Sequence, residues 1–311
     1  MVPPVVVDKE RRRFYDGGLP ADDSGAGGEP ADPSRDILVV LDRQLDPANG
    51  REAFVLKRRI AYDDRRCGEL IVPTALAVFK TDLTSVPALF AWLVPKTGAH
   101  LPAALIHDGL IWNPRTETQT YISTTGTVID RVEADRIFRD GMADTGTGLV
   151  RRWLVWTAVT LATMLSAQGT SASALGRAYY RFIVVATLFS IAWLGYVSTA
   201  DLFDRTEDWP LTYELSWMAD RRFAAELMIG VAAAIVIPIV LGLLWGKFRI
   251  AGWIAGIGVA LLLHVTLGVL AVTAIYVVLE WLAAKLPAVL LLIAAVVVVG
   301  TSAAVLIAVL L

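Results

Sequence analysis

Residues 250 to 279 read IAGWIAGIGVALLLHVTLGVLAVTAIYVVL, a run without any Asp, Glu, Lys or Arg. A helix of about 20 apolar residues crosses the hydrocarbon core of a bilayer, and this run exceeds that length. The segment 286 to 311 is equally free of charged residues. The latter part of the chain is therefore expected to be embedded in a membrane as helices.

Outward from this run, the hydropathy pattern predicts an all-α transmembrane module of four helices over residues 182 to 311. The expected spans are 182–199, 224–245, 250–278 and 286–311. A Ser/Ala/Gly-rich linker, 168–181, precedes them. The preceding stretch, 148–167, has an apolar centre of only about 13 residues, which is short for a span and favours a domain helix or an interfacial helix.

Charge and hydropathy limit the class of protein. The chain has 311 residues and a formal net charge of -2, so it lacks the basic field of a nucleic-acid-binding protein, and no nucleic-acid partner is expected. Its mean hydropathy of +0.58 is too apolar for an ordinary soluble protein, and the lipid bilayer is the expected partner of the second half. Basic residues near the span ends are more numerous on the side of the front half, which places that half in the cytoplasm: they are Arg151, Arg152, Arg177, Arg181, Lys247 and Arg249, against Arg205, Arg221, Arg222 and Lys285 on the other side.

The front half is expected to be a small soluble α+β domain over residues 37–167. Residues 1–36 are rich in Gly, Pro, Asp and Arg without apolar periodicity, and are predicted to form a disordered arm. Short runs with β-branched residues predict strands at 37–41, 54–62 and 70–79. Proline and glycine positions predict helices at about 102–112 and 128–143.

Three side chains of the two predicted domain helices could carry chemistry. His107 and Asp108 lie on the first helix and Asp135 on the second. Packed together, they allow His107 to act as a general base, Asp135 to orient its other ring nitrogen, and Asp108 to hold a hard cation. Neighbouring residues of a helix point about 100° apart, so His107 and Asp108 must have different roles.

Other interpretations of the polar residues stay open. The same His and Asp side chains could form a buried network that fixes helix packing, and a zinc site from His100, His107 and Asp135 is a further option. Asp82 and Ser85 fit a turn that closes a strand, with Ser85 as a nucleophile the alternative. In the third predicted span, His264 is a candidate functional residue or an imidazole hydrogen-bonded to a neighbouring helix.

The front half resembles a bacterial and prophage-associated family of domains of unknown function. The family pattern runs VP, GF-x-TD-x-ASIP, AA-x-x-HD-x-LY and R-x-x-AD-x-x-F, followed by a Met. The residues that fall on it in order are Val72-Pro73, Phe79, Thr81-Asp82, Ser85-Val86-Pro87, Ala103-Ala104, His107-Asp108, Leu110, Arg131, Ala134-Asp135, Phe138 and Met142. Ile111 replaces the family's Tyr, and Ala77-Val78 precedes Phe79 in place of a glycine. The resemblance covers roughly residues 71–143 and not the transmembrane helices; it implies a bacterial protein and assigns no activity. Together with the spans and the charge bias above, the expectation is a multi-pass protein of the bacterial inner membrane with a cytoplasmic front domain.

The HD and AD motifs are also similar to the HD-x-x-Y and AD-x-x-F motifs of phospholipase A2 enzymes. This likeness implies Ca²⁺ or another divalent cation on Asp108 and a water activated by His107. Two parts of the enzyme pattern are missing: Ile111 stands where the Tyr beside Asp135 is expected, and Pro95-Lys96-Thr97-Gly98 stands in for a glycine-rich calcium loop.

Three functions follow as hypotheses. The first is a membrane protein whose front domain binds a protein partner or a second copy, or is purely structural. The second is a membrane-tethered, cation-assisted hydrolase of lipids or other esters that uses His107, Asp108 and Asp135. The third is a pore-forming or toxin-like role for the helices, although the spans lack the polar stripe of a wide aqueous channel.

Overall fold

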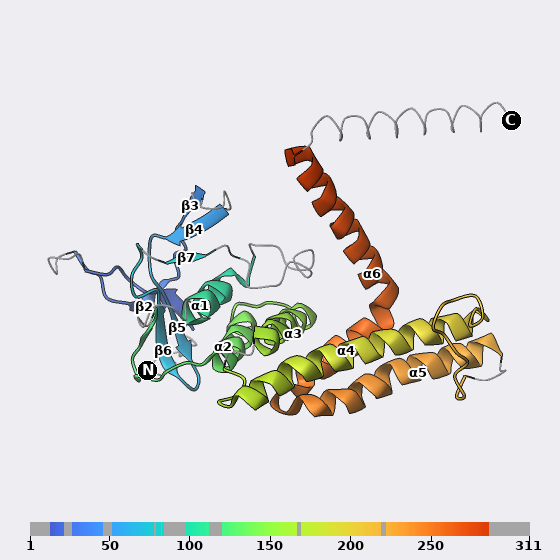
Figure 1. The fold of residues 1–311 in the computed structure, drawn as a ribbon. Helices are drawn as coiled ribbons and strands as arrows, with labels where there is room; N and C mark the ends of the chain where they lie inside the picture. Colours follow the sequence, from blue (N-terminus) through green and yellow to red (C-terminus); the bar gives the residue numbers. More distant parts are fainter. Residues whose placement is uncertain are drawn as a thin grey trace, which may run out of the picture.

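The structure is a computed structural model that describes residues 13–21, 27–45, 52–77, 79–81, 83, 98–111, 120–166, 169–218 and 222–285. A β-rich region with two small sheets comes first, and a helical region follows it (Figure 1).

The larger sheet has five antiparallel strands in the order β2-β1-β5-β6-β8. The strands are β1 (Phe14–Asp16), β2 (Asp32–Asp36), β5 (Ile60–Asp64), β6 (Gly68–Val72) and β8 (Ile122–Ser123). The β5–β6 hairpin is its centre, with Tyr62 opposite Leu70. Asp64 Oδ1 accepts the backbone N–H groups of Arg66 and Cys67 at 2.9 and 2.8 Å, which holds the turn between these two strands.

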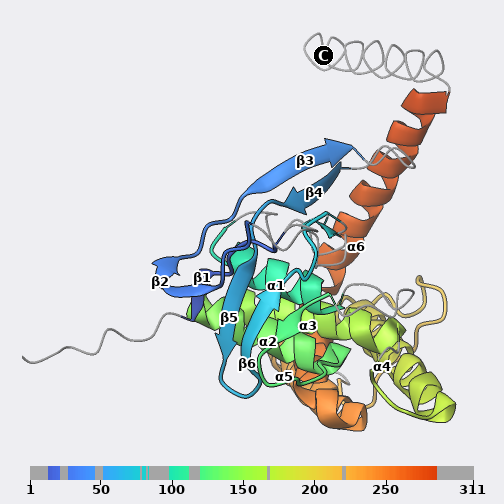
Figure 2. The same cartoon turned by 90° about the vertical axis from the view of Figure 1, so that its left-hand side faces the viewer.

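The smaller sheet has the strand order β3-β4-β7, formed by β3 (Leu41–Leu45), β4 (Glu52–Leu56) and β7 (Lys80–Thr81). Its strands β3 and β4 stand apart from the helices (Figures 1 and 2). The side chain of Leu56, at the end of β4, is fully buried in the core shared with the larger sheet. The two sheets are therefore parts of one domain.

Three helices lie behind the larger sheet, in the order α1 (Leu101–Ile111), α2 (Arg131–Asp144) and α3 (Leu149–Ser166) (Figure 2). One core packs α1 against β5 and β6 through buried Leu70, Leu105 and Ile106. Helix α2 begins at Asp130, whose carboxylate accepts the N–H of Glu133 at 2.7 Å and so caps the helix. We call β1 to α3 the front domain.

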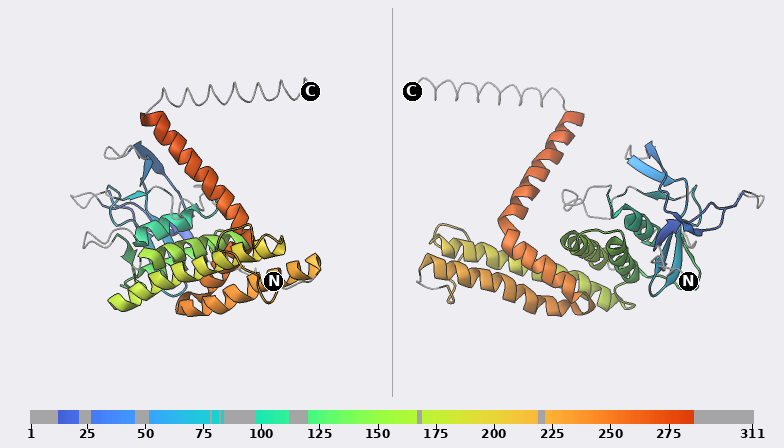
Figure 3. Two further views of the ribbon diagram at one scale, coloured as in Figure 1. Left: turned by 45° about the vertical axis from the view of Figure 1, so that its right-hand side comes forward. Right: turned by 180° about the vertical axis from the view of Figure 1, so that it is seen from behind.

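The second region, here called the bundle, contains α4 (Ala174–Leu202), α5 (Phe223–Gly242), the 3₁₀ segment η2 (Leu243–Phe248) and α6 (Arg249–Lys285). At Gly246 the backbone has φ 57° and ψ -116°, and here the chain reverses so that α5 and the first part of α6 lie side by side (Figure 3). Helix α6 leaves its helical conformation again at Leu262, with φ -113°, and its second part turns away from α4 and α5.

Front domain and bundle share a continuous apolar core. This cluster joins Phe138 and Met142 of α2 with Trp156 of α3, Val184 of α4 and Trp245 of η2. Arg181 of α4 also donates to the backbone carbonyl oxygens of Leu165 and Ser166 at 2.9 and 2.8 Å, which satisfies acceptors left free at the end of α3. The bundle is thus packed onto the domain. Of the expected linker 168–181, residues 174–181 belong to α4.

Part of the predicted disordered arm is ordered, and the prediction for residues 14–16 and 32–36 is wrong. These residues form β1 and β2, and the Tyr15 side chain is fully buried. The ionised Asp16 is tolerated there because Arg58 donates to both of its carboxylate oxygens at 2.6 Å. A three-residue strand is too short to show alternation, and the charge of Asp16 is compensated by Arg58 and Arg35, which lie far along the chain.

The strand boundaries also differ from the prediction. The expected strand 54–62 is two strands of different sheets, β4 and β5, and the expected strand 37–41 meets β3 only at Leu41. The expected strand 70–79 corresponds to the end of β6. The two expected domain helices are present as α1 and α2, shifted by up to three residues at an end.

The four-helix membrane module is only partly supported. Within the described residues, two helical segments are long and apolar enough to cross a membrane, Ala174–Leu202 and Phe223–Val265, and the second contains the reversal at Gly246. Helix α3 is not among these segments. The fourth expected span, 286–311, lies outside the described residues.

Candidate functional site

Helix α1 brings His107 and Asp108 against the sheet because the next residue has no side chain. A Cβ atom built on Gly109 would lie 2.0 Å from Val72 Cγ1 of β6. Any larger residue at this position would push α1 away from β6, so Gly109 allows the close approach of helix and strand. The close packing of α1 on β6 therefore explains why a glycine follows the His-Asp pair.

Helix α2 supplies the main partner of His107. His107 Nε2 lies 2.8 Å from Asp135 Oδ1, and the two side chains are 1% and 3% exposed. The imidazole also stacks on Phe138, one turn further along α2, with ring centroids 4.9 Å apart. The hydrogen bond and the stacking fix the orientation of the ring.

The second oxygen of Asp135 is bound by α3. Thr163 Oγ1 donates to Asp135 Oδ2 at 2.7 Å and accepts from Arg131 Nε at 3.1 Å. Three helices are thus joined through one buried carboxylate. We call His107, Asp108, Asp135, Thr163 and Arg131 the His107 network.

Asp108 lies on the other side of the imidazole. His107 Nδ1 is buried, and Asp108 Oδ1 lies 3.9 Å from it, beyond hydrogen-bonding distance. Thr81 Oγ1 of β7 donates to Asp108 Oδ2 and accepts the N–H of Leu83 at 2.9 Å. The Asp108 side chain is 12% exposed, so among the carboxylates of the network it is the one nearer to solvent.

The charges of the network determine the protonation of His107. Burial acts to lower the pKa of His107, because an imidazolium is poorly solvated in the interior. The carboxylates of Asp108 and Asp135 act in the opposite direction and hold the pKa of His107 above its ordinary value. The protonated ring has no lone pair left to accept a proton, so His107 in this state is a cation between two anions.

Of the site residues named from sequence, the structure brings together His107, Asp108 and Asp135 in one network. His264 lies apart in α6, where its Nε2 is 3.2 Å from Thr199 Oγ1 of α4. Asp82 and Ser85 lie outside the described residues, as do Pro95, Lys96 and Thr97 of the expected cation loop.

Metal binding finds limited support. The part of the chain that the structure describes holds no group of three or more His, Cys, Asp or Glu side chains placed to bind a metal ion. A zinc site from His100, His107 and Asp135 is therefore not formed. Asp108 alone could offer an oxygen to a divalent cation at the edge of the network.

Sequence reasoning named Thr81 in the Thr81-Asp82 motif but not its contact with Asp108, missed Thr163, and overlooked Glu226 within the second predicted span. Thr157, Thr160 and Thr163 recur every three residues on α3, and all three are buried. A hydroxyl stripe at helical spacing in a helix facing the domain was the signal that could have identified Thr163.

Comparison with known families gives one result for this region. Residues 54–159 match the model of a family described as "Protein of unknown function (DUF1353)". The match begins in β4 and ends within α3, so it contains His107, Asp108 and Asp135 but neither Thr163 nor the bundle. Comparisons with curated proteins and with solved structures give no match.

Proposed function

We propose that this is a membrane-anchored, non-enzymatic protein in which α3 to α6 hold the domain of unknown function rigidly at the bilayer surface, where it binds a protein partner. The observation that carries the proposal is the apolar core shared by α2, α3, α4 and η2. A domain packed into the base of its anchor has a fixed orientation toward the membrane, as a docking platform requires.

The membrane part of the proposal is supported by the apolar surface of the bundle. Large side chains such as Phe189, Met228 and Val272 are exposed by 66%, 68% and 67%. A surface of this kind is costly in water and favourable in lipid. Lys247 and Arg249 flank Phe248, which shares the apolar core with α3, whereas the described part of the loop between α4 and α5 carries the carboxylates of Asp204, Glu207, Asp208 and Glu214. By the positive-inside rule, the proposal assigns the domain to the cytoplasmic side of a bacterial inner membrane.

The non-enzymatic part rests on the His107 network. Both oxygens of Asp135 and Nε2 of His107 are used by protein partners, and the ring is 1% exposed. The two carboxylates raise the pKa of His107, so the ring keeps its proton to a higher pH than a free imidazole does, and a protonated ring cannot act as a general base. Such a network is well suited to fix the packing of α1, α2 and α3.

Membrane anchoring is tested on the full chain expressed in bacteria. The chain is expected to stay in the membrane fraction after washes with alkaline carbonate and with urea, and to need detergent for release. Recovery as a dispersed monomer in detergent-free buffer would contradict the proposal.

Partner binding is tested with a photo-crosslinking amino acid at Leu45, which is 63% exposed on β3. A discrete adduct is expected in intact cells, with another protein or with a second copy of the chain. The matched control places the same amino acid at Val128, which is 84% exposed before α2. Equal adducts at both positions, or none at Leu45, would count against a specific surface around β3.

A cation-assisted hydrolase is the second candidate, and one observation favours it. Asp135 fixes Nε2 of His107, and the other ring nitrogen faces the more exposed Asp108. Detergent-solubilised protein with Ca²⁺, Mg²⁺ or Mn²⁺ would then release fatty acid from phospholipid vesicles, and Asp108→Asn would abolish this release. Under the primary proposal, no divalent ion supports release above that of the Asp108→Asn variant.

A further inference from the structure

Basic side chains gather at the end of the bundle that packs on the front domain. Two come from α4 and two from the junction of η2 and α6, and together we call them the basic patch: Arg177, Arg181, Lys247 and Arg249. The ring of Phe248 connects the two pairs. Its centroid lies 5.2 Å from that of Tyr180 of α4 and 5.1 Å from Lys247 Nζ.

The positive charge of the basic patch has no carboxylate beside it. Residues 145–200 and 227–279 contain no Asp or Glu, and within the described part of the chain none of the four side chains forms an ion pair. Arg177 and Arg181 each donate to a backbone carbonyl oxygen at 2.9 Å, an acceptor without net charge. A guanidinium has five N–H donors, so both side chains keep donors for a further acceptor.

Exposed apolar side chains adjoin the basic patch. Phe182 follows Arg181 on α4 and is 69% exposed, while Leu243 and Leu244 of η2 are 55% and 48% exposed. Tyr179 Oη donates to the carbonyl oxygen of Leu244 at 2.6 Å, so these parts of α4 and η2 are in contact. Basic groups beside an apolar surface match a molecule that is anionic at one end and apolar at the other.

From this arrangement we propose that the basic patch binds the phosphate of an anionic phospholipid in the cytoplasmic leaflet. Lys247 and Arg249 donate to the phosphate oxygens, and the acyl chains lie along Phe182 and Leu243. A soluble anion would use the charge but leave the apolar neighbours in water. The inference rests on the proposed membrane anchoring and adds which class of lipid the anchor selects.

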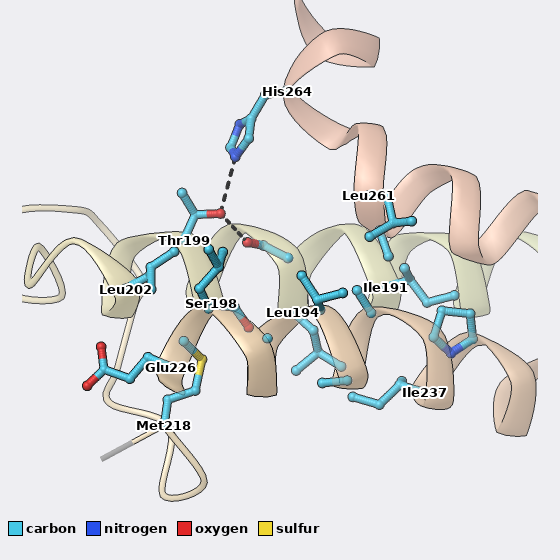
Figure 4. A pocket seen from close by; sticks show the side chains of 18 residues that line it. Ile191, Leu194, Ser198, Thr199, Leu202, Met218, Glu226, Ile237, Leu261 and His264 are labelled. Atoms are coloured by element: carbon cyan, nitrogen blue, oxygen red, sulfur yellow. Dashed lines mark hydrogen bonds between the residues drawn. The ribbon is translucent and has the colours of Figure 1, made fainter. Parts of the chain in front are cut away.

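The cavity of about 220 Å³ in the bundle is a different place. Its walls come from α4, α5, α6 and Met218 of the loop between α4 and α5 (Figure 4), and none of the described residues that line it is Lys or Arg. A phosphate there would have no basic side chain to bind. The anionic head is therefore assigned to the basic patch.

The test uses the purified full chain in a non-ionic detergent, titrated with phosphatidylglycerol or with phosphatidylcholine. Binding is followed by the shift of the thermal unfolding midpoint, because a ligand that binds the folded state raises it. Phosphatidylglycerol is expected to bind about tenfold more tightly than phosphatidylcholine at low salt, with a smaller difference at high salt. Equal affinities at low salt would overturn the inference. So would an equal shift with glycerol 3-phosphate, which carries the phosphate without acyl chains.

Two double variants locate the effect. Lys247→Gln with Arg249→Gln is expected to lose most of the preference for phosphatidylglycerol, since both side chains are exposed and belong to the basic patch. The matched control, Arg222→Gln with Lys285→Gln, removes two exposed basic residues outside the patch and is expected to keep the preference. Loss of the preference in the control pair, or its retention in the first pair, contradicts the site. Should the first pair fail to fold, Lys247→Gln alone is expected to lose about threefold of the preference.

The carbonate and urea washes of the full chain distinguish two failures. A chain that stays in the membrane fraction but binds both lipids equally contradicts the lipid selection alone. A chain recovered as a dispersed monomer without detergent contradicts the membrane anchoring on which that selection rests.

Discussion

The front domain buries charged side chains in pairs, whereas the bundle buries mainly apolar ones with a few hydroxyl and indole hydrogen bonds. In the domain, Arg136 binds Asp64 at 2.7 Å, and Asp135 binds His107 at 2.8 Å. In the bundle, the comparable buried polar contact is Trp245 Nε1 to Thr187 Oγ1, at 2.9 Å. A domain that folds in water can use strong, selective ion pairs, whereas helices in lipid, the environment proposed for the bundle, gain more from close packing and weak hydrogen bonds.

Helix α3 combines the two kinds of packing. Toward α2, the Thr163 hydroxyl of α3 donates to Asp135. The Arg139 guanidinium carbon lies 5.3 Å from the ring centroid of Trp153 and 5.5 Å from that of Trp156. Toward α4 and η2, α3 offers apolar side chains to the shared core. Helix α3 therefore makes both kinds of contact. We expect the two kinds to differ in how much they stabilise the fold.

The largest loss of unfolding free energy is expected from Asp135→Ala. It leaves the buried His107 ring and the Thr163 hydroxyl without the carboxylate that they bind, and removing one side of a buried charged pair costs about 3–5 kcal/mol of unfolding free energy. Chemical unfolding of the detergent-solubilised chain measures the loss. The control on the same helix is Asp140→Asn, whose partners Arg136 and Arg139 are nearer the surface, with an expected loss of at most about 1 kcal/mol. Similar losses in both variants would show that burial does not strengthen the network.

The next effect concerns packing between α1 and the sheet. Gly109→Ala places a methyl group 2.0 Å from Val72 Cγ1, so the helix must move, with an expected loss of about 1–3 kcal/mol. The double variant with Val72→Ala removes the γ carbons and should recover part of that loss. No recovery in the double variant would mean that the backbone conformation, and not the contact, requires glycine at this position.

A third prediction concerns pH. The folded pKa of His107 is raised, so its stabilising contribution is fully present below the unfolded pKa of about 6.5 and is lost as the pH rises through the folded pKa. Stability should therefore fall from pH 6.5 upward, by at most about 1.4 kcal/mol per pH unit. In His107→Gln this slope between pH 6.5 and 8 should vanish; a slope that persists there would assign it to another group.

The sequence predicts the local features of both regions and misses contacts between residues that are far apart in the chain. Helices α1 and α2 and the apolar segments were predicted because their signals are local, namely proline and glycine positions and runs without charge. Strand β1 was missed because Asp16 is compensated by Arg58, 42 residues further along the chain. The pairing of His107 with Asp135 was predicted as a geometric option. The threonine stripe of α3 could have identified Thr163 as a buried hydroxyl, but its bond to Asp135 depends on how α3 packs against α2, which the stripe does not encode.

The smallest effect is expected in the bundle, from Thr187→Val. This variant keeps the shape of the side chain and removes the oxygen that accepts from Trp245 Nε1, while Thr187 also loses its bond to the carbonyl oxygen of Ile183. Hydrogen bonds between membrane helices contribute about 0.6 kcal/mol on average, so the expected loss is under about 1 kcal/mol, measured as for Asp135→Ala. If Thr187→Val costs as much as Asp135→Ala, the bundle depends on its polar contacts as the domain does.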